Sequence, residues 1–396
     1  MPGKHCLFGI ALSVTLTASA LAIGQTPEHR DRSYGSGDTP AEAGPLATDL
    51  SGALDAKDIG KAMRKVGDWE LGHSQENFSQ DWTFAALYRG YIAAAASLHD
   101  EQYRDAMVGV GKKFDWELGS RQTHADDQAI GTVYLDLYRQ FHDKKMLEPT
   151  KEEMDRWITL PDVCAESCPK WHDDKTPLWW WCDSLFMAPP VLADLYAVTG
   201  NKAYLARMDK GWWETSALLY DPQEHLYSRD TSYLDKREAN GKKIFWSRGN
   251  GWVIAGLTEV LDEMPKDYPT RAKYVEQFKQ MAAKLKSIQG EDGLWGPGLL
   301  DAKSYPLPEV SGSAFFVYAM AWGINHGILD RATYLPAVKK GWAGLVSHIY
   351  ADGRLGSIQP IGGGPDTYKP QTSYVFGVGA FLMAGAELRT LTEHAH

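Results

Sequence analysis

The stretch WWWCDSLFMAPP, residues 179–190, places one carboxylate, Asp183, between three tryptophans and an apolar run. Indole rings around a carboxyl group remove it from water, which disfavours the charged form and raises the pKa. A carboxyl group with a raised pKa can act as a general acid near neutral pH. Capping of the following helix is the alternative, because aspartate is favoured at helix starts. We interpret Asp183 as the strongest candidate for a proton donor.

A second acidic pair, Asp126 and Asp127, follows His124 in the stretch HADDQAIG. Adjacent side chains on a helix point in different directions. We therefore expect one of the two aspartates to face a ligand and the other to cap the helix. The sequence does not distinguish them.

Arginine and aromatic side chains accompany these carboxylates. Arg248 heads SRGNGW, with Trp252 one turn further on. A guanidinium group can bind a carboxylate through two parallel hydrogen bonds, although a structural ion pair is the alternative for Arg248. Aromatic rings can stack on a pyranose, although tryptophan at helical spacing usually belongs to the core. The further candidates for ligand contact are Trp82, His124, Trp181, Arg229, Trp246, Gln371 and Tyr374.

Most of these residues lie at the starts of six similar segments. Each segment runs from a polar or aromatic loop into a stretch rich in Ala, Gly and aromatic residues, beginning at Ser79, His124, Trp181, Ser247, Pro308 and Lys369. A helix that is apolar on all sides is interior, whereas a helix with a charged stripe faces water, as predicted for the stretches from Arg271 and Thr333. The pattern predicts an all-α fold, an (α/α)6 barrel of six helical hairpins. If the six starts share one face, their unpaired N–H groups favour an acidic ligand there.

The N-terminal part of the chain differs in composition from the rest and indicates where the protein is located. The first 22 residues, MPGKHCLFGIALSVTLTASALA, combine a basic start, an apolar run and small residues at the end, as is typical of a signal peptide. We therefore expect a periplasmic or secreted protein, with a flexible polar leader at 23–45 and a single catalytic domain at 46–396. Cys164 and Cys168 could form a disulfide there, and Cys182 is expected to be a small buried hydrophobe.

Composition and charge argue against several classes of partner. The 396-residue chain has 41 Lys and Arg against 51 Asp and Glu, a formal charge of −10 that argues against a nucleic-acid surface. After the signal peptide, no uninterrupted apolar stretch is long enough to span a membrane. We expect no metal or other cofactor, because CAESC lacks partner ligands and GGGP lacks the Lys and Ser/Thr of a phosphate loop.

An ordered set of motifs connects the chain to a known family. HADDQAIG, WWWCDSLFMAPPVLADLY, FWSRGNGW, GLW, EVSGSA and KPQTSY together resemble glycoside hydrolase family 105, the unsaturated rhamnogalacturonyl hydrolases, which are related to the unsaturated glucuronyl hydrolases of family 88. The resemblance covers residues 46–390 and implies an (α/α)6 barrel, in agreement with the helix pattern. It also implies action on oligosaccharides left by polysaccharide lyases, whose non-reducing end is a 4,5-unsaturated uronate.

The resemblance implies a mechanism in which one aspartate hydrates the C4=C5 vinyl ether. The aspartate protonates C4 and then, as a base, activates the water that adds at C5, after which the hemiketal rearranges and expels the aglycone. Asp183 matches this acid/base, one of Asp126 and Asp127 matches a second acidic residue, and Arg248 and Trp252 match a substrate-binding pair.

One departure from the family pattern affects the substrate. Arg229 stands about where some members have a histidine. The accepted sugar therefore stays open between rhamnogalacturonan products and glucuronyl units linked to rhamnose, as in ulvan or arabinogalactan-type glycans.

Three other functions use the same residues differently. An inverting glycosidase would pair Asp183 with a base at Asp126 or Asp127 and act on saturated glycans. A sugar epimerase on the same ring would rely on histidines, of which only His124 lies near a segment start. A non-catalytic glycan-binding protein would keep the aromatic residues and tolerate Asp183→Asn.

Overall fold

The computed structural model describes residues 36–160 and 176–393, which belong to one compact unit. The predicted signal peptide, residues 23–35 of the leader, and Cys164 and Cys168 lie outside the described residues.

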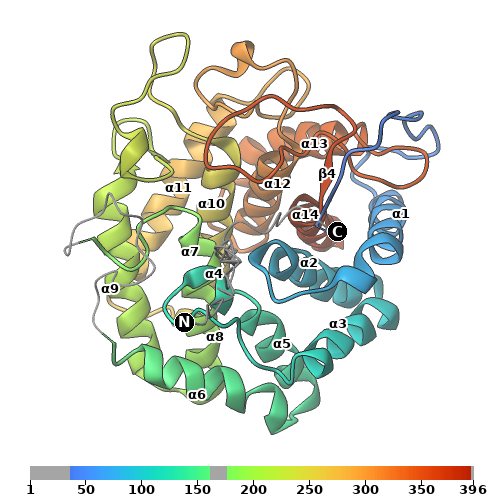
Figure 1. Ribbon diagram of the computed structural model, residues 1–396. Coiled ribbons are helices and arrows are strands. Elements are labelled where there is room, and N and C mark those ends of the chain that lie inside the picture. Colours follow the sequence, from blue (N-terminus) through green and yellow to red (C-terminus); the bar gives the residue numbers. More distant parts are fainter. Residues whose placement is uncertain (1–35, 161–175, 394–396) are drawn as a thin grey trace, which may run out of the picture. The chain divides into compact units, whose positions relative to one another are not determined.

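The helices alternate along the chain between an outer and an inner ring (Figure 1). The outer helices are α1 (Ala56–Ser74), α3 (Glu101–Lys113), α6 (Glu148–Trp157), α9 (Lys202–Leu219), α11 (Arg271–Ser287) and α13 (Arg331–Val346). The inner helices are α2 (Trp82–Leu98), α4 (Ala125–Gln128) with α5 (Gly131–Phe141), α7 (Ser184–Met187) with α8 (Pro189–Thr199), α10 (Ser247–Glu263), α12 (Val310–Asn325) and α14 (Val375–Glu393).

The inner ring is closed. Its helices contact one another in the order α2, α5, α8, α10, α12 and α14, and α14 contacts α2 again. Each of the six segments predicted to be interior holds the start of an inner helix. The predicted all-α barrel of six helical hairpins is therefore confirmed.

The pattern of apolar residues explains which helices are interior. Helix α12 is buried at every position from Val310 to Ile324, whereas α11 buries only positions spaced three or four residues apart. A stripe of that spacing covers one side of a helix and leaves the other in water. Helix α14 has the length and apolar composition of a membrane span, but 72% of that window is buried inside the structure, as expected of a core helix.

Small residues allow the inner helices to approach one another closely. A Cβ atom on Gly379 of α14 would lie 2.2 Å from the carbonyl oxygen of Ala86 in α2. A Cβ atom on Gly256 of α10 would lie 2.3 Å from the carbonyl oxygen of Leu185 in α7. The Ala and Gly content of these segments therefore reflects backbone contacts inside the ring.

One inner helix is interrupted for a covalent reason. Helix α7 ends at Met187 and α8 begins with Pro189 and Pro190, which carry no backbone N–H to donate. Proline is tolerated at the first positions of a helix, because those N–H groups have no partner within the helix. The prolines thus separate α7 from α8 and leave α7 as a short helix that begins immediately after Asp183.

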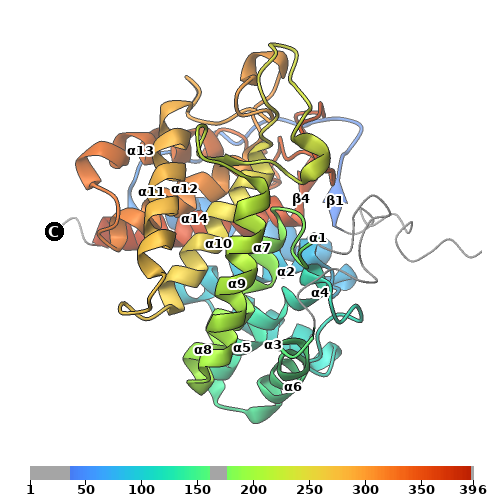
Figure 2. The same cartoon turned by 90° about the vertical axis from the view of Figure 1, so that its left-hand side faces the viewer.

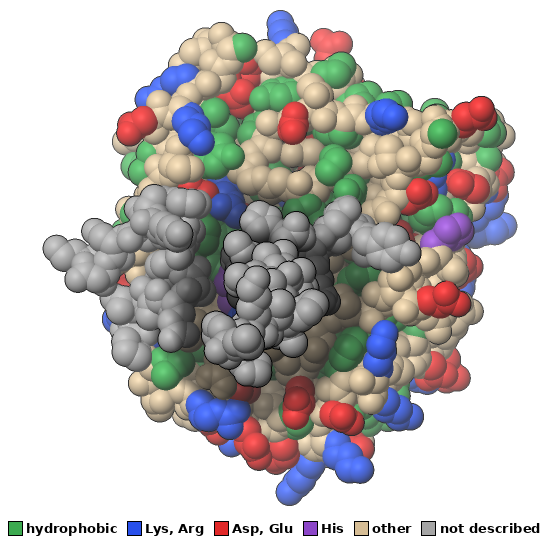
Figure 3. Space-filling view, in the orientation of Figure 1, with side chains coloured by type: hydrophobic (Ala, Val, Ile, Leu, Met, Phe, Trp, Pro, Cys, Tyr) green, Lys and Arg blue, Asp and Glu red, His purple; other side chains and the backbone are tan. Residues whose placement is uncertain are grey.

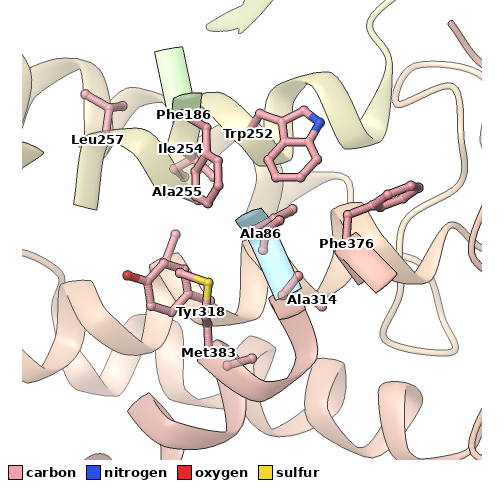
Figure 4. Packing of buried hydrophobic residues seen from close by; sticks show 14 of the residues in the cluster. Ala86, Phe186, Trp252, Ile254, Ala255, Leu257, Ala314, Tyr318, Phe376 and Met383 are labelled. Atoms are coloured by element: carbon pink, nitrogen blue, oxygen red, sulfur yellow. The ribbon is translucent and has the colours of Figure 1, made fainter. Parts of the chain in front are cut away.

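Aromatic side chains from five inner helices meet close to where those helices begin, and Figure 4 shows Phe186, Trp252 and Phe376 among them. The Trp252 ring lies 4.9 Å from the Phe186 ring and 4.6 Å from the Phe315 ring. The Trp82 ring stacks on Phe376 at 5.5 Å and meets Trp252 edge-on. These residues come from the first two turns of α2, α7, α10, α12 and α14. We call this end of the inner ring, where the helices begin, its N-terminal face.

The strands and loops lie around this frame. Strand β1 (Gly37–Asp38) pairs antiparallel with β4 (Ser373–Tyr374), with Gly37 opposite Tyr374 (Figure 2). Strand β2 (Tyr220–Asp221) pairs antiparallel with β3 (Leu226–Tyr227). Short 3₁₀ turns span Gln75–Asn77, Lys144–Met146, Thr231–Tyr233 and Ala302–Ser304.

The described end of the leader is bonded to the barrel domain. Besides the β1–β4 pair, Ala351 donates its N–H to the carbonyl of Pro45 at 2.9 Å, and Arg354 donates to the carbonyl of Ala43. Part of the leader predicted at 23–45 is therefore hydrogen-bonded to the barrel domain, and the flexibility of the leader stays a prediction.

Charged side chains of both signs are interspersed on the face drawn in Figure 3. This distribution matches the scattering of Lys and Arg among Asp and Glu along the sequence.

Candidate active site

Asp183 immediately precedes α7, but its side chain makes no capping hydrogen bond to that helix. The capping alternative is therefore wrong for this residue. Its Oδ2 atom lies 3.4 Å from the thiol sulfur of Cys182 and 3.7 Å from Nε of Arg229. Burial raises the pKa of Asp183, and the nearby cations Arg229 and Arg248 oppose that rise. The structure thus gives Asp183 the environment expected of a general acid.

Arg229 is held beside Asp183 by several contacts. Its Nη1 donates to Oδ2 of Asp230 at 2.6 Å, and its guanidinium lies 5.4 Å from the centre of the Trp180 ring. Its backbone carbonyl accepts the N–H of Cys182 at 2.8 Å. Arg229 stands about where some family members have a histidine. It therefore places a fixed cation next to the candidate acid, Asp183.

The two adjacent aspartates have different surroundings. Oδ1 of Asp127 accepts hydrogen bonds from Nε and Nη2 of Arg121 at 2.9 and 2.5 Å, and Oδ2 accepts the Arg121 N–H at 2.7 Å. Asp126 is buried, and burial raises its pKa to about 7, with Arg121 opposing and Asp81 and Asp183 contributing to the rise. Asp126 is thus the member of the pair whose pKa depends on the charge of Asp183.

The expectation that one of this pair caps the helix is wrong. The side chain of His124 takes that position, because its Nδ1 accepts the N–H of Asp126 at 3.3 Å. The His124 ring also lies 4.9 Å from the ring of Trp181. A histidine in this role was not suggested by the sequence pattern, because Ser, Thr, Asp and Asn are the usual caps.

Arg248 is completely buried and anchors a loop. Its terminal nitrogens donate to the carbonyls of Gln359 and Pro360, both at 2.7 Å, and Nη1 lies 3.8 Å from Oε1 of Glu309. The guanidinium lies over the ring of Trp246, 4.3 Å from its centre. The ion-pair alternative is therefore realised. Binding of a uronate by Arg248 requires exchange with one of these carbonyls and stays a prediction.

The remaining aromatic candidates divide between two environments. Trp246 donates its indole N–H to Oε1 of Gln359 at 3.0 Å, and Trp181 packs against His124. Trp82 and Trp252 belong to the aromatic cluster of the N-terminal face, and Nε1 of Trp252 has no hydrogen-bond partner in the described part of the chain.

Gln371 and Tyr374 contact the leader. The side-chain amide of Gln371 donates to the carbonyl of Pro40 at 3.1 Å. Tyr374 pairs with Gly37, where a Cβ atom would lie 2.5 Å from the tyrosine ring, and its own ring stacks on Phe376 at 5.3 Å. These contacts join the sixth inner helix to residues 37–40, and ligand contact by either residue stays a prediction.

Several residues of the site were not among the sequence candidates. Asp81 contributes to the electrostatics of Asp126, and its place in the motif SQDW, before Trp82, was a usable signal. The thiol of Cys182 contacts Asp183, although the residue was expected only to fill space. Glu309 and Gln359 hold Arg248 and Trp246 from distant parts of the chain, and nothing in the sequence indicates these pairs.

The arrangement of charged groups supports proton transfer. No cluster of three or more His, Cys, Asp or Glu side chains suited to a metal ion occurs within the described ranges. Two carboxyl groups with raised pKa values, the partly buried Asp183 and the buried Asp126, lie among the cations Arg121, Arg229 and Arg248. Such a site can protonate a neutral group and attract an anionic one.

Comparison with known proteins identifies the family. The model of glycosyl hydrolase family 88 matches residues 57–392. A protein of Formosa agariphila (strain DSM 15362) named unsaturated 3S-rhamnoglycuronyl hydrolase is 42% identical over 352 residues, covering 86% of this chain and 93% of that protein.

Two solved structures share the fold over nearly their whole length. A family 88 glycosyl hydrolase from Bacteroides vulgatus is 28% identical with a TM-score of 0.78, covering 85% of this chain and 99% of that chain. A protein described as a polysaccharide lyase is 30% identical with a TM-score of 0.77, covering 86% and 99%. The family model matches most of the chain, so the resemblance seen in the motifs is confirmed: this chain belongs to glycosyl hydrolase family 88 and is a glycoside hydrolase.

Proposed function

We propose that this hydrolase removes a 4,5-unsaturated glucuronyl residue from rhamnose at the non-reducing end of lyase-generated oligosaccharides. The observation that carries the reaction type is Asp183, a partly buried carboxyl group, with its side chain 13% exposed, that caps no helix and has a raised pKa. The choice of a glucuronyl–rhamnose substrate is supported by the name of the Formosa relative.

The proposed chemistry is hydration of the C4=C5 double bond. Protonated Asp183 gives its proton to C4, and the ring oxygen stabilises the positive charge that develops at C5. The resulting carboxylate takes a proton from the water that adds at C5. The hemiketal formed in this way opens and releases the aglycone, so one carboxyl group serves first as acid and then as base.

The electrostatics around Asp183 suit both steps. Burial favours the neutral acid needed for the first step, whereas Arg229 and Arg248 favour the carboxylate needed for the second. We assign to Asp126 the orientation of the uronate or water, because it is electrostatically coupled to Asp183. Contact of the sugar with Trp181, Trp246 and Trp252, and of the uronate with Arg248 and Arg229, completes the proposal.

The test follows the ultraviolet absorbance of an unsaturated glucuronyl–rhamnose disaccharide, since hydration destroys the conjugated chromophore. Wild type should remove the absorbance, and Asp183→Asn should lower the rate by a factor of roughly 10²–10⁴, the usual contribution of a general acid. Asp221→Asn is the matched control, because Asp221 of strand β2 is a buried carboxylate paired with Lys243. Activity that survives in Asp183→Asn would contradict the assignment.

Elimination is a second candidate reaction, favoured by the likeness to a protein described as a polysaccharide lyase. A lyase removes the C5 proton of a saturated uronate and creates the C4=C5 bond. Absorbance would then rise on saturated uronyl substrates instead of falling on unsaturated ones. Sugar release from saturated glycans without any absorbance change would point to the two-carboxylate glycosidase.

We further propose a periplasmic or secreted location. The composition of the first 22 residues supports it, with a small-residue cleavage motif at Ala20-Leu21-Ala22. Sequencing of the mature N-terminus from fractionated cells tests this proposal, and recovery of intact Met1 from the cytoplasm would contradict it.

A further inference from the structure

The two carboxylate oxygens of Asp183 have different surroundings. Oδ2 has two neighbours, the thiol sulfur of Cys182 at 3.4 Å and Nε of Arg229 at 3.7 Å. No side chain among the residues that the structure describes donates a hydrogen bond to Oδ1, and the remaining donor near the carboxylate is the backbone N–H of Asp183 itself. A carboxyl group with donors on one oxygen carries its proton on the other.

Cys182 is fixed in place by its backbone and by its packing. Its N–H donates to the carbonyl of Arg229, so the same residue holds the cysteine backbone and faces the aspartate. Helix α10 packs directly against the sulfur, because a Cβ atom on Gly249 would lie 3.1 Å from Sγ. The thiol is completely buried and unpaired with another cysteine.

The thiol is a hydrogen-bond donor in this environment. Burial and the neighbouring carboxylate raise the pKa of Cys182 well above its ordinary value, so the sulfur keeps its proton. A protonated thiol is a weak donor, and a donor to a carboxylate stabilises the charged form and lowers the pKa of that carboxylate.

We propose that Cys182 is a positioning residue for the reaction: its thiol holds Oδ2 of Asp183, so that Oδ1 carries the proton and delivers it to the substrate. This inference rests on the proposed hydration of a C4=C5 double bond. The proton leaves Oδ1 for C4, and the electron pair of the O–H bond stays on the carboxylate.

The charge formed in that step spreads onto Oδ2, where the thiol and Arg229 stabilise it. Oδ1 then takes a proton from the attacking water, which restores the starting acid. The sulfur forms no covalent bond and is not oxidised at any point.

Replacement of the thiol should change the titration of the acid. In Cys182→Ala the charged form of Asp183 loses a donor, so its pKa rises by about one unit, the amount expected for one hydrogen bond to a charged group. The acid must be protonated to react, so activity is lost as pH rises through its pKa. The alkaline limb of the kcat profile should therefore move up by about one pH unit, and kcat at the optimum should fall about tenfold with little change in KM.

Cys182→Ser keeps a donor at the same position and should restore most of kcat and the alkaline limb of wild type. Ser216→Ala is the control for a lost buried hydrogen bond, because Ser216 bonds to Trp212 and Tyr227 without contacting Asp183. This control should lower the melting temperature and leave the pH profile unchanged. If Cys182→Ala behaves like Ser216→Ala, the thiol has only a packing role and the inference is wrong.

A second measurement separates this inference from the proposed function. The carboxyl stretch of Asp183 can be titrated by infrared difference spectroscopy, with Asp183→Asn identifying the band. If wild type fails to act on the unsaturated disaccharide, the proposed function fails, but the spectrum still reports whether the thiol shifts the pKa of Asp183. An identical Asp183 pKa in wild type and Cys182→Ala would overturn the inference.

Discussion

At the scale of single residues, Asp183 and Asp126 are both carboxyl groups with raised pKa values, and they differ in the charges that face them. Two cations, Arg229 and Arg248, act to lower the pKa of Asp183. Asp126 has one cation, Arg121, and three carboxylates contribute to its pKa of about 7. Like charges in one site discourage simultaneous ionisation. Near neutral pH the protonation of Asp126 therefore depends on the state of Asp183, which suits a residue that handles the same water or uronate.

Separate replacement of Asp126 and Asp127 should affect different properties: the first mainly catalytic activity, the second mainly stability. Asp126→Asn removes a carboxyl group from the site, and we expect at least a hundredfold loss of kcat/KM without a loss of melting temperature at pH 8. Asp127→Asn weakens the bonds to Arg121 and should cost about 1–3 kcal/mol of unfolding free energy, with a smaller loss of activity. Steady-state kinetics and urea unfolding of both variants provide the test. A large activity loss confined to Asp127→Asn would reverse the assignment.

At the scale of elements, helix periodicity predicted the inner ring, because an interior helix must be apolar on all sides. The same pattern placed the N-terminal ends at which Asp126 and Asp183 lie. The partners of Arg248 could not be predicted, since Glu309 and Gln359 reach it only after the ring has closed. The contact between the Cys182 thiol and Asp183 could not be predicted for a different reason. The sequence does not show whether the sulfur of a buried cysteine lies next to a carboxylate.

Close contact between inner helices makes a prediction about glycine. In Gly379→Ala the new methyl group would meet the Ala86 carbonyl at 2.2 Å, so α2 and α14 must separate. We expect a loss of about 2–4 kcal/mol of unfolding free energy. In Gly72→Ala of the outer helix α1 the methyl group meets nothing within 4 Å, and higher helix propensity should stabilise the protein by up to about 1 kcal/mol. Denaturant unfolding of the two variants should therefore give changes of opposite sign, and equal changes would show that the ring tolerates separation.

At the scale of the whole molecule, carboxylates outnumber cations in a partly buried cluster as well as in the overall composition. Asp136 and Asp194 share Arg139 with Glu263, and the pKa of Asp136 is raised to about 6. Each buried carboxyl group with a raised pKa favours folding most when it is protonated. The contribution of these groups to the stability of the protein should therefore decline as pH rises through their raised pKa values.

Glu70 offers a test of that decline away from the active site. The residue lies on α1 with its side chain 4% exposed, and burial raises its pKa from 4.5 to about 7. The folded state binds this proton more tightly than the unfolded state, so the stabilisation is complete below pH 4.5 and is lost as pH rises through about 7.

Glu70→Gln carries no titrating proton. It should exceed wild type in unfolding free energy by on the order of 3 kcal/mol at pH 8, and the difference should shrink towards pH 5. Urea unfolding at both pH values measures this change, with Glu101→Gln as the control because that side chain is 79% exposed. A pH-independent difference would show that Glu70 is ionised or neutral alike in both states, and that the decline has another origin.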